Sequence, residues 1–209
     1  MRAPTILVAL AAFVLPVAAL ADASSTSSPP VDASVTRLLD AKSTIKWNFD
    51  GEGGRYGHAE TLVAAPADKV VSVAADFAHY KELHRKFQTA RVVGKEADQT
   101  DVYMRYPVRI GPVTFELYEV MRFKPVRDEG GARVLEGIGI KGDMTKGRTV
   151  VTVRPISATH SLVQFDVLLK PRVPAPQFMI DEELRDGAHD FVDGLRHRSQ
   201  GWVGPVTQL

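Results

Sequence analysis

The chain has 209 residues, of which 44% are hydrophobic and 24% are charged, and its formal net charge is +1. This length and composition suffice for one domain with its own core, and the balanced charges make nucleic acid an unexpected partner. Because the chain has no cysteine, disulfides, thiol chemistry, thiolate metal sites and lipid attachment through cysteine are excluded.

The first 21 residues have the pattern of a signal peptide. A short positive start precedes an almost wholly apolar run over 6–15, and small residues at 19–21 suit signal peptidase, with 21–23 an equal alternative. The rival interpretation is an uncleaved membrane anchor, but Pro16 and the small residues favour cleavage. We therefore predict an exported protein, periplasmic or secreted.

Residues 22–50 are predicted to be a linker and a short N-terminal segment. The run SSTSSPP over 24–30 is polar and of low complexity, and a short helix is expected over 35–41. The folded domain is expected over 51–200, followed by a tail over 201–209.

The domain is expected to begin with a strand and two short helices. The glycine-rich segment 51–57 fits neither nucleotide-binding fingerprint, so it is interpreted as a loop that enters a strand near 58–64. Pro66 can occupy the first turn of a helix over 66–77, and a second short helix is expected over 79–87.

From Thr89 onward the apolar residues alternate, which is typical of strands. The connections between these segments are short and rich in turn residues, so consecutive strands should be antiparallel neighbours in a meander. The predicted strands cover 90–96, 101–110, 113–123, 132–141, 148–155 and 161–169.

The alternation also predicts which side chains face the interior, while Gln164 and Asp166 face away. Glu119 shares the inward parity, so its carboxylate must be paired or protonated. Arg105 or Arg109 could pair with it, or Glu119 could orient a ligand. The predicted inward apolar residues are Val102, Met104, Tyr106, Val108, Val113, Phe115, Leu117, Met121, Phe123, Val163, Phe165, Val167 and Leu169.

A long amphipathic helix is predicted over 176–200. Leu184, Ala188, Phe191 and Leu195 repeat at spacings of four, three and four, and Ile180 lies one turn earlier. These residues form one apolar stripe, which must be buried against the sheet.

Two glycines, Gly187 and Gly194, lie seven residues apart on one flank of that stripe. Glycine is unfavourable in a helix interior, so either a strand backbone or a bound molecule should approach closely there.

The histidines do not form a convincing catalytic or metal site. His189, Asp193 and His197 share one helix face, but that face lies opposite the apolar stripe and is interpreted as solvated. Neither Gly-x-Ser-x-Gly nor His-Glu-x-x-His occurs. No catalytic residue, metal or cofactor is predicted.

Three segments carry a resemblance to a known superfamily. They are 64–70 (AAPADKV) with Phe77 and Tyr80 downstream, 142–147 (GDMTKG) leading into 149–155, and the Pro174-Ala175-Pro176 break before Leu184, Phe191, Leu195 and Arg196. Over about 56–198 the sequence resembles the START-like (SRPBCC) superfamily, specifically the bacterial polyketide cyclase/dehydrase and coenzyme Q-binding group.

This resemblance implies an α+β helix-grip fold. In such a fold a curved antiparallel sheet of about seven strands grips the C-terminal helix, and two short helices follow the first strand. It also implies an apolar tunnel that holds a lipid, an isoprenoid such as a quinone, or a polycyclic molecule. The superfamily has no single catalytic residue set that could be carried over.

Three functions are consistent with these features. The first is an exported carrier of a small hydrophobic ligand, which could contact a membrane transiently. The second is a cyclase or dehydrase in which Glu119 and Tyr106 transfer protons, and the third is a packed interaction module without a ligand. The expected ligand-binding residues are Tyr106, Phe115, Leu117, Glu119, Met121, Phe165, Leu184, Ala188 and Phe191.

Overall fold

The structure is a computed structural model that describes residues 31–41, 43–110 and 112–201. The predicted signal peptide over 1–21 and the linker over 24–30 lie outside the described residues, as does the tail beyond 201. No described helix is long and apolar enough to cross a membrane.

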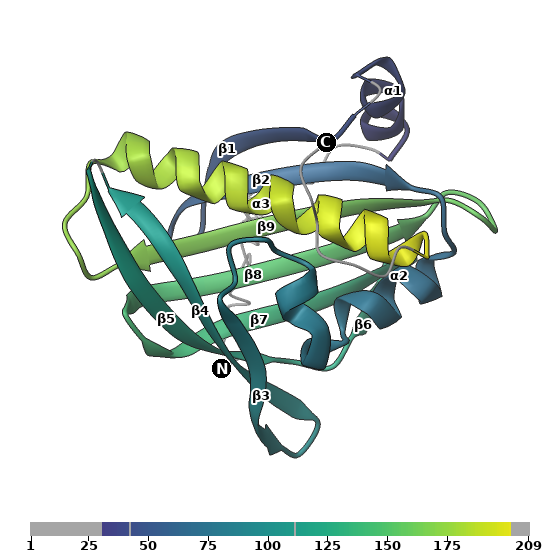
Figure 1. Ribbon diagram of the computed structural model, residues 1–209. Coiled ribbons are helices and arrows are strands. Elements are labelled where there is room, and N and C mark those ends of the chain that lie inside the picture. The colour runs from purple at the N-terminus through teal and green to yellow at the C-terminus, as the bar shows by residue number, and fades with distance from the viewer. Residues whose placement is uncertain (1–30, 42, 111, 202–209) are drawn as a thin grey trace, which may run out of the picture.

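Nine strands and four helices make up the described chain (Figure 1). In order they are α1 (Val31–Ala41), β1 (Ile45–Gly51), β2 (Gly54–Val63), α2 (Ala67–Ala74), the 3₁₀ helix η1 (Phe77–Glu82), β3 (Thr89–Glu96), β4 (Gln99–Ile110), β5 (Val113–Phe123), β6 (Arg127–Glu129), β7 (Ala132–Gly142), β8 (Met144–Pro155), β9 (Ser161–Pro171) and α3 (Gln177–Ser199).

All nine strands form one antiparallel sheet in the order β1-β2-β9-β8-β7-β5-β4-β3, and β6 pairs with β7. Figure 1 shows β3, β4 and β5 crossing the view steeply, whereas β7, β8 and β9 run roughly along α3. The sheet is therefore strongly curved, and α3 lies across its inner face. The predicted α+β helix-grip fold and its meander are confirmed.

The apolar stripe of α3 is buried as predicted, since Leu184, Ala188, Phe191 and Leu195 are each at most 5% exposed. Close backbone approaches hold the helix at both sides of this stripe. A Cβ atom on Gly194 would lie 2.1 Å from the carbonyl oxygen of Leu83, so the segment after η1 touches the helix there. The predicted close approach at Gly194 is confirmed, although the neighbour is the backbone of Leu83 and not a strand.

The sheet has two strands more than the expected seven, β1 and the short β6. The interpretation of 51–57 as a loop was wrong, because only its first residues turn and Gly54 already begins β2. Positive φ angles at Gly53 and Gly54 make a tight β1–β2 hairpin. Trp47 and Phe49 alternate with polar residues in β1. This alternation is too short to predict a strand next to the linker.

Other expectations at the ends of elements need correction. The second helix was expected over 79–87, but η1 covers Phe77–Glu82. Pro66 precedes α2 as its N-cap instead of lying in the first turn. Val113 is 50% exposed, because it lies at the tip of the β4–β5 hairpin, where the sheet ends.

The face carrying His189, Asp193 and His197 is half-buried instead of solvated. The hydroxyl of Thr44, just before β1, donates a 2.6 Å hydrogen bond to Asp193, and Arg196 forms a 3.0 Å ion pair with it. The unpredicted strand β1 extends the sheet on this flank, which explains the burial.

Helix α1 covers the outer face of the sheet over β2, where a polar cluster is buried. Glu60 is fully buried and accepts hydrogen bonds from Arg37 of α1 (3.0 Å) and from Gln164 (3.1 Å). His58 contacts Asp166 at 2.5 Å and lies 3.7 Å from Glu60. Gln164 thus faces away from α3, as predicted, but α1 buries it.

Candidate ligand cavity

A cavity lies between α3 and the inner face of the sheet. Strands β4, β5, β8 and β9 supply its floor, α3 supplies its roof, and residues between η1 and β3 close one side. The free volume is about 120 Å³. Ligand pockets are typically larger, roughly 300–1,000 Å³, so a lipid-sized molecule would have to displace lining side chains or extend through the mouth.

Seven of the nine predicted binding residues line this cavity: Tyr106, Leu117, Glu119, Met121, Phe165, Leu184 and Phe191. The other two do not line it. Ala188 is fully buried within the packed stripe of α3, and Phe115 is half-buried near the tip of the β4–β5 hairpin. In place of Ala188, Gly187 forms that part of the roof.

Methionine is unusually prominent in the lining. Of the five methionines, Met104, Met121, Met144 and Met179 all line the cavity. Methionine is unbranched and polarisable, so such a lining can adapt to the shape of a ligand. Met144 and Met179 lie outside the alternating strand pattern, and only the fold reveals that they share a site with Met104 and Met121.

Glu119 is the most unusual residue of the cavity floor. It is 2% exposed, and it lies next to an irregularity in the β5–β7 pairing, where the register shifts between Val120 and Met121. Its carboxyl lies over two glycines: a Cβ atom would meet its Oε1 at 2.1 Å on Gly139 and at 1.8 Å on Gly147. These two positions must lack side chains for the carboxyl to occupy its place.

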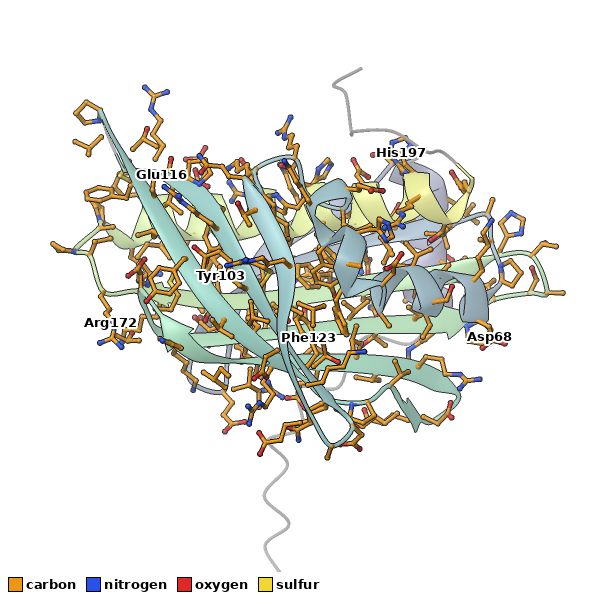
Figure 2. All side chains as sticks on the ribbon, turned by 60° about the horizontal axis from the view of Figure 1, so that its bottom comes forward. Asp68, Tyr103, Glu116, Phe123, Arg172 and His197 are labelled. Atoms are coloured by element: carbon orange, nitrogen blue, oxygen red, sulfur yellow. The ribbon has the colours of Figure 1, made fainter. Side chains whose placement is uncertain are left out.

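The predicted alternative of an ion pair between Glu119 and Arg105 is not formed. Arg105 points to the opposite face of the sheet and lies 3.4 Å from Glu116, which Figure 2 shows near the tip of the β4–β5 hairpin. Burial raises the pKa of Glu119 to about 8. The carboxyl is therefore mostly protonated and uncharged at neutral pH.

Three buried oxygens of the floor have no hydrogen-bond partner within the described part of the chain. They are Oε2 of Glu119, the phenolic oxygen of Tyr106 and Oγ1 of Thr149. Burial raises the pKa of Tyr106 well above its usual value, so its hydroxyl stays protonated. Thr149 was not predicted, because its position in β8 carries no sequence signal that separates it from other threonines.

The charged residues of the lining lie toward one end. Lys86, before β3, donates a 2.7 Å hydrogen bond to Glu183 in the N-terminal half of α3. His84 stacks on Phe87 with ring centroids 4.7 Å apart, and burial lowers the pKa of His84 to about 4, so it is neutral. Sequence reasoning missed His84, because nothing in its spacing connects it with the sheet.

No group of three or more histidine, aspartate or glutamate side chains in the described residues is placed to hold a metal ion. The candidate site is therefore an apolar cavity with a small, uncharged polar floor.

Comparison with known proteins identifies the fold. No protein-family model and no curated protein matches the chain. Among solved structures, the STAR-related lipid transfer protein from Xanthomonas axonopodis aligns with a TM-score of 0.64 and 16% identity over 77% of this chain and 96% of its own. A START superfamily protein from Mycobacterium smegmatis aligns with a TM-score of 0.59 and 16% identity, covering 69% and 97%.

The human StarD13 lipid transfer and protein localization domain aligns with a TM-score of 0.55 and 12% identity, covering 85% of this chain and all of that domain. At such low identities the likeness concerns the fold and not the ligand. The described chain therefore has the START-like helix-grip fold.

Proposed function

We propose that this chain is an exported protein that binds and carries a hydrophobic molecule in the cavity beneath α3. The observation that carries the proposal is the lining, in which four methionines and several aromatic side chains surround a buried space at the place where α3 crosses the sheet. The START-like fold supports it, as does the Xanthomonas neighbour, which is named as a lipid transfer protein. The signal-peptide pattern over 1–21 supports export.

The ligand classes that fit are a lipid, an isoprenoid such as a quinone, or a polycyclic molecule. Because the free volume is only about 120 Å³, loading such a molecule requires the flexible methionines to change rotamer. This lining suits a carrier that accepts molecules of somewhat different shape.

A pair of leucine substitutions on α3 tests the proposal. Gly187 lines the cavity, and a Cβ atom there makes only ordinary contact, 3.5 Å from Nε2 of His84. Gly187→Leu should therefore fill the cavity without breaking the helix. Glu182→Leu adds the same side chain at an exposed position and is the matched control.

Both variants and the natural chain would be incubated with a total lipid extract from a bacterial membrane, repurified and analysed by native mass spectrometry. We expect a bound apolar molecule on the natural chain and on Glu182→Leu, and its loss from Gly187→Leu. Equal retention by all three folded proteins would contradict binding in this cavity.

An enzyme of the cyclase or dehydrase type is the second candidate. That function needs Glu119 inside the cavity with a raised pKa, and both conditions are met, while Arg105 pairs with Glu116 instead. A protonated Glu119 and the Tyr106 hydroxyl could transfer protons to or from a bound carbonyl compound. Glu119→Gln should then abolish turnover of a polyketide-like substrate while binding persists. The packed module without a ligand is disfavoured by the cavity.

Contact with a membrane is part of the carrier proposal. Phe178, in the first turn of α3, is 70% exposed, and Val113 is exposed at the hairpin tip. In Figure 1 the tip of the β4–β5 hairpin and the start of α3 lie toward the same end of the molecule. Phe178→Ser should weaken sedimentation with phosphatidylcholine vesicles, whereas unchanged sedimentation would argue against this contact.

A further inference from the structure

Three unpaired polar atoms belong to the lining of the same cavity. Tyr106 of β4 and Glu119 of β5 lie on neighbouring strands, and the register pairs them with Leu117 and Met104 respectively, so they are diagonal neighbours on the same face. Thr149 lies in β8, two residues beyond Gly147. The Glu119 carboxyl lies directly over Gly147.

Leaving these atoms unpaired is costly. A buried oxygen without a partner costs roughly 1–3 kcal/mol, and native proteins rarely leave three such atoms in one cavity. The side chains of Tyr106, Glu119 and Thr149 are all at least nine-tenths buried, so bulk water does not reach them. A ligand that brings hydrogen-bonding atoms to this place would recover that cost.

The charges beside Glu119 disfavour an ionised partner at the floor, since Arg109 lies five residues along β4 from Met104, which Glu119 faces. A carboxylate or phosphate would lie beside Glu119, and Arg105 of the adjacent strand points to the other face, toward Glu116. Lys86 is paired with Glu183. The titratable groups that face the cavity are Tyr106 and Arg109 of β4, Glu119 of β5, His84 and Lys86 before β3, and Glu183 of α3.

The three floor groups share one chemistry. A protonated carboxyl, a phenol and an aliphatic hydroxyl each carry one O–H donor and can also accept a hydrogen bond. They suit a hydroxyl, which donates one hydrogen bond and accepts two, or a carbonyl oxygen, which accepts from two of the three groups.

From this geometry we infer that the ligand carries an uncharged oxygen group, a carbonyl or a hydroxyl, which hydrogen-bonds to Glu119, Tyr106 and Thr149 on the cavity floor. The inference rests on the proposed function and narrows it, since it favours apolar alcohols, ketones and quinones over fatty acids and phospholipid phosphates as the group held inside.

Four probes with the same ten-carbon chain separate the chemistries: decan-1-ol, decan-2-one, decanoate and decylamine. Isothermal titration calorimetry near neutral pH should show the alcohol or the ketone binding about tenfold or more tightly than decanoate, because the decanoate carboxylate would be buried beside the Glu119 carboxyl. Whichever of the alcohol and ketone binds more tightly identifies the preferred group.

Variants of the floor residues test whether these residues cause the preference for one probe over another. Tyr106→Phe and Thr149→Val should each weaken binding of the preferred probe by about five- to tenfold. Tyr118→Phe removes a phenol from the outer face, where Tyr118 stacks on Tyr103, and should change nothing. Raising the pH past about 8 should weaken binding of decan-2-one, because ionised Glu119 cannot donate to a carbonyl, and Glu119→Gln should remove this dependence.

The outcomes separate this inference from the proposed function. If all four probes bind equally, and Gly187→Leu abolishes that binding, the cavity is a binding site but the inference is wrong. Tighter binding of decanoate or decylamine would also overturn it, as would floor variants that behave like the natural chain. If no probe binds, both the inference and the proposed function fail.

Discussion

The two glycines of α3 provide a sharp test of how the helix is held. Helix propensity alone predicts that replacing either by alanine stabilises the protein by about 1 kcal/mol. The contacts that an added Cβ atom would make differ between the two glycines. A Cβ atom on Gly187 would have an ordinary contact 3.5 Å from His84, whereas on Gly194 it would lie 2.1 Å from the Leu83 carbonyl oxygen and 2.7 Å from its carbonyl carbon.

Gly187→Ala should therefore raise the free energy of unfolding by up to about 1 kcal/mol. In Gly194→Ala the backbone around Leu83 must move, and overpacking of this kind costs roughly 1–3 kcal/mol, which outweighs the gain in propensity. We expect Gly194→Ala to be less stable than the natural chain by up to about 2 kcal/mol.

Urea denaturation followed by far-ultraviolet circular dichroism measures both variants under the same conditions. The expected result is a higher transition midpoint for Gly187→Ala and a lower one for Gly194→Ala, with unchanged slopes. Equal midpoints, or stabilisation by Gly194→Ala, would refute the close approach of Leu83 to the helix.

Three further predictions concern the buried polar groups. Burial would lower the pKa of His58, but the hydrogen bond to Asp166 and the nearby negative charge of Glu60 outweigh this effect and raise the pKa. The stabilisation by protonated His58 is therefore complete below its ordinary pKa of 6.5 and is lost as the pH rises through the raised pKa. Thermal melts should show a melting temperature that declines over this pH range, and His58→Gln should reduce the decline. An identical pH profile for the variant would contradict this prediction. For Glu119, whose pKa rises from 4.5 to about 8, the folded form keeps a proton that the unfolded chain loses. Stability should fall between these values as pH increases, and Glu119→Gln should lessen the fall; a parallel slope would show that Glu119 is ionised in the folded protein. Finally, Gly147→Ala places a Cβ atom 1.8 Å from the present position of Glu119 Oε1, so it should displace the carboxyl and weaken decan-2-one binding in a folded protein, and calorimetry showing full affinity would count against that position.

The regular part of the fold was predictable because its pattern is long. The apolar stripe of α3 extends over three turns, and the meander strands alternate over seven or more residues, so periodicity identifies both. Strand β1 was not predicted, since its seven residues fall almost wholly within the range 22–50 that was interpreted as a linker and short N-terminal segment, just before a glycine-rich turn. Its pairing with β2 and its contacts with α3 depend on tertiary packing, which no local pattern encodes.

The cavity was predictable on the strands but not at its edges. Parity placed Tyr106, Leu117 and Glu119 inward, because alternation fixes which face a residue occupies. Parity could not distinguish a residue that lines the cavity from one that packs in the core. Ala188 was therefore predicted as a binding residue, although Gly187 forms the roof at this point. The space for the Glu119 carboxyl depends on Gly139 and Gly147, which face each other across two strands that only the sheet order brings together.

The central claim is that an apolar molecule enters the cavity beneath α3, and the methionines allow it to be tested directly. Met104, Met121, Met144 and Met179 line the cavity, and Met1 is the fifth. Titration of the protein, labelled with ¹³C at the methionine methyl groups, with decan-1-ol can be followed by nuclear magnetic resonance. We expect the four cavity methyl signals to shift along one saturable binding curve. If these four signals stay unchanged while the protein is folded, decan-1-ol does not enter the cavity and the account is contradicted.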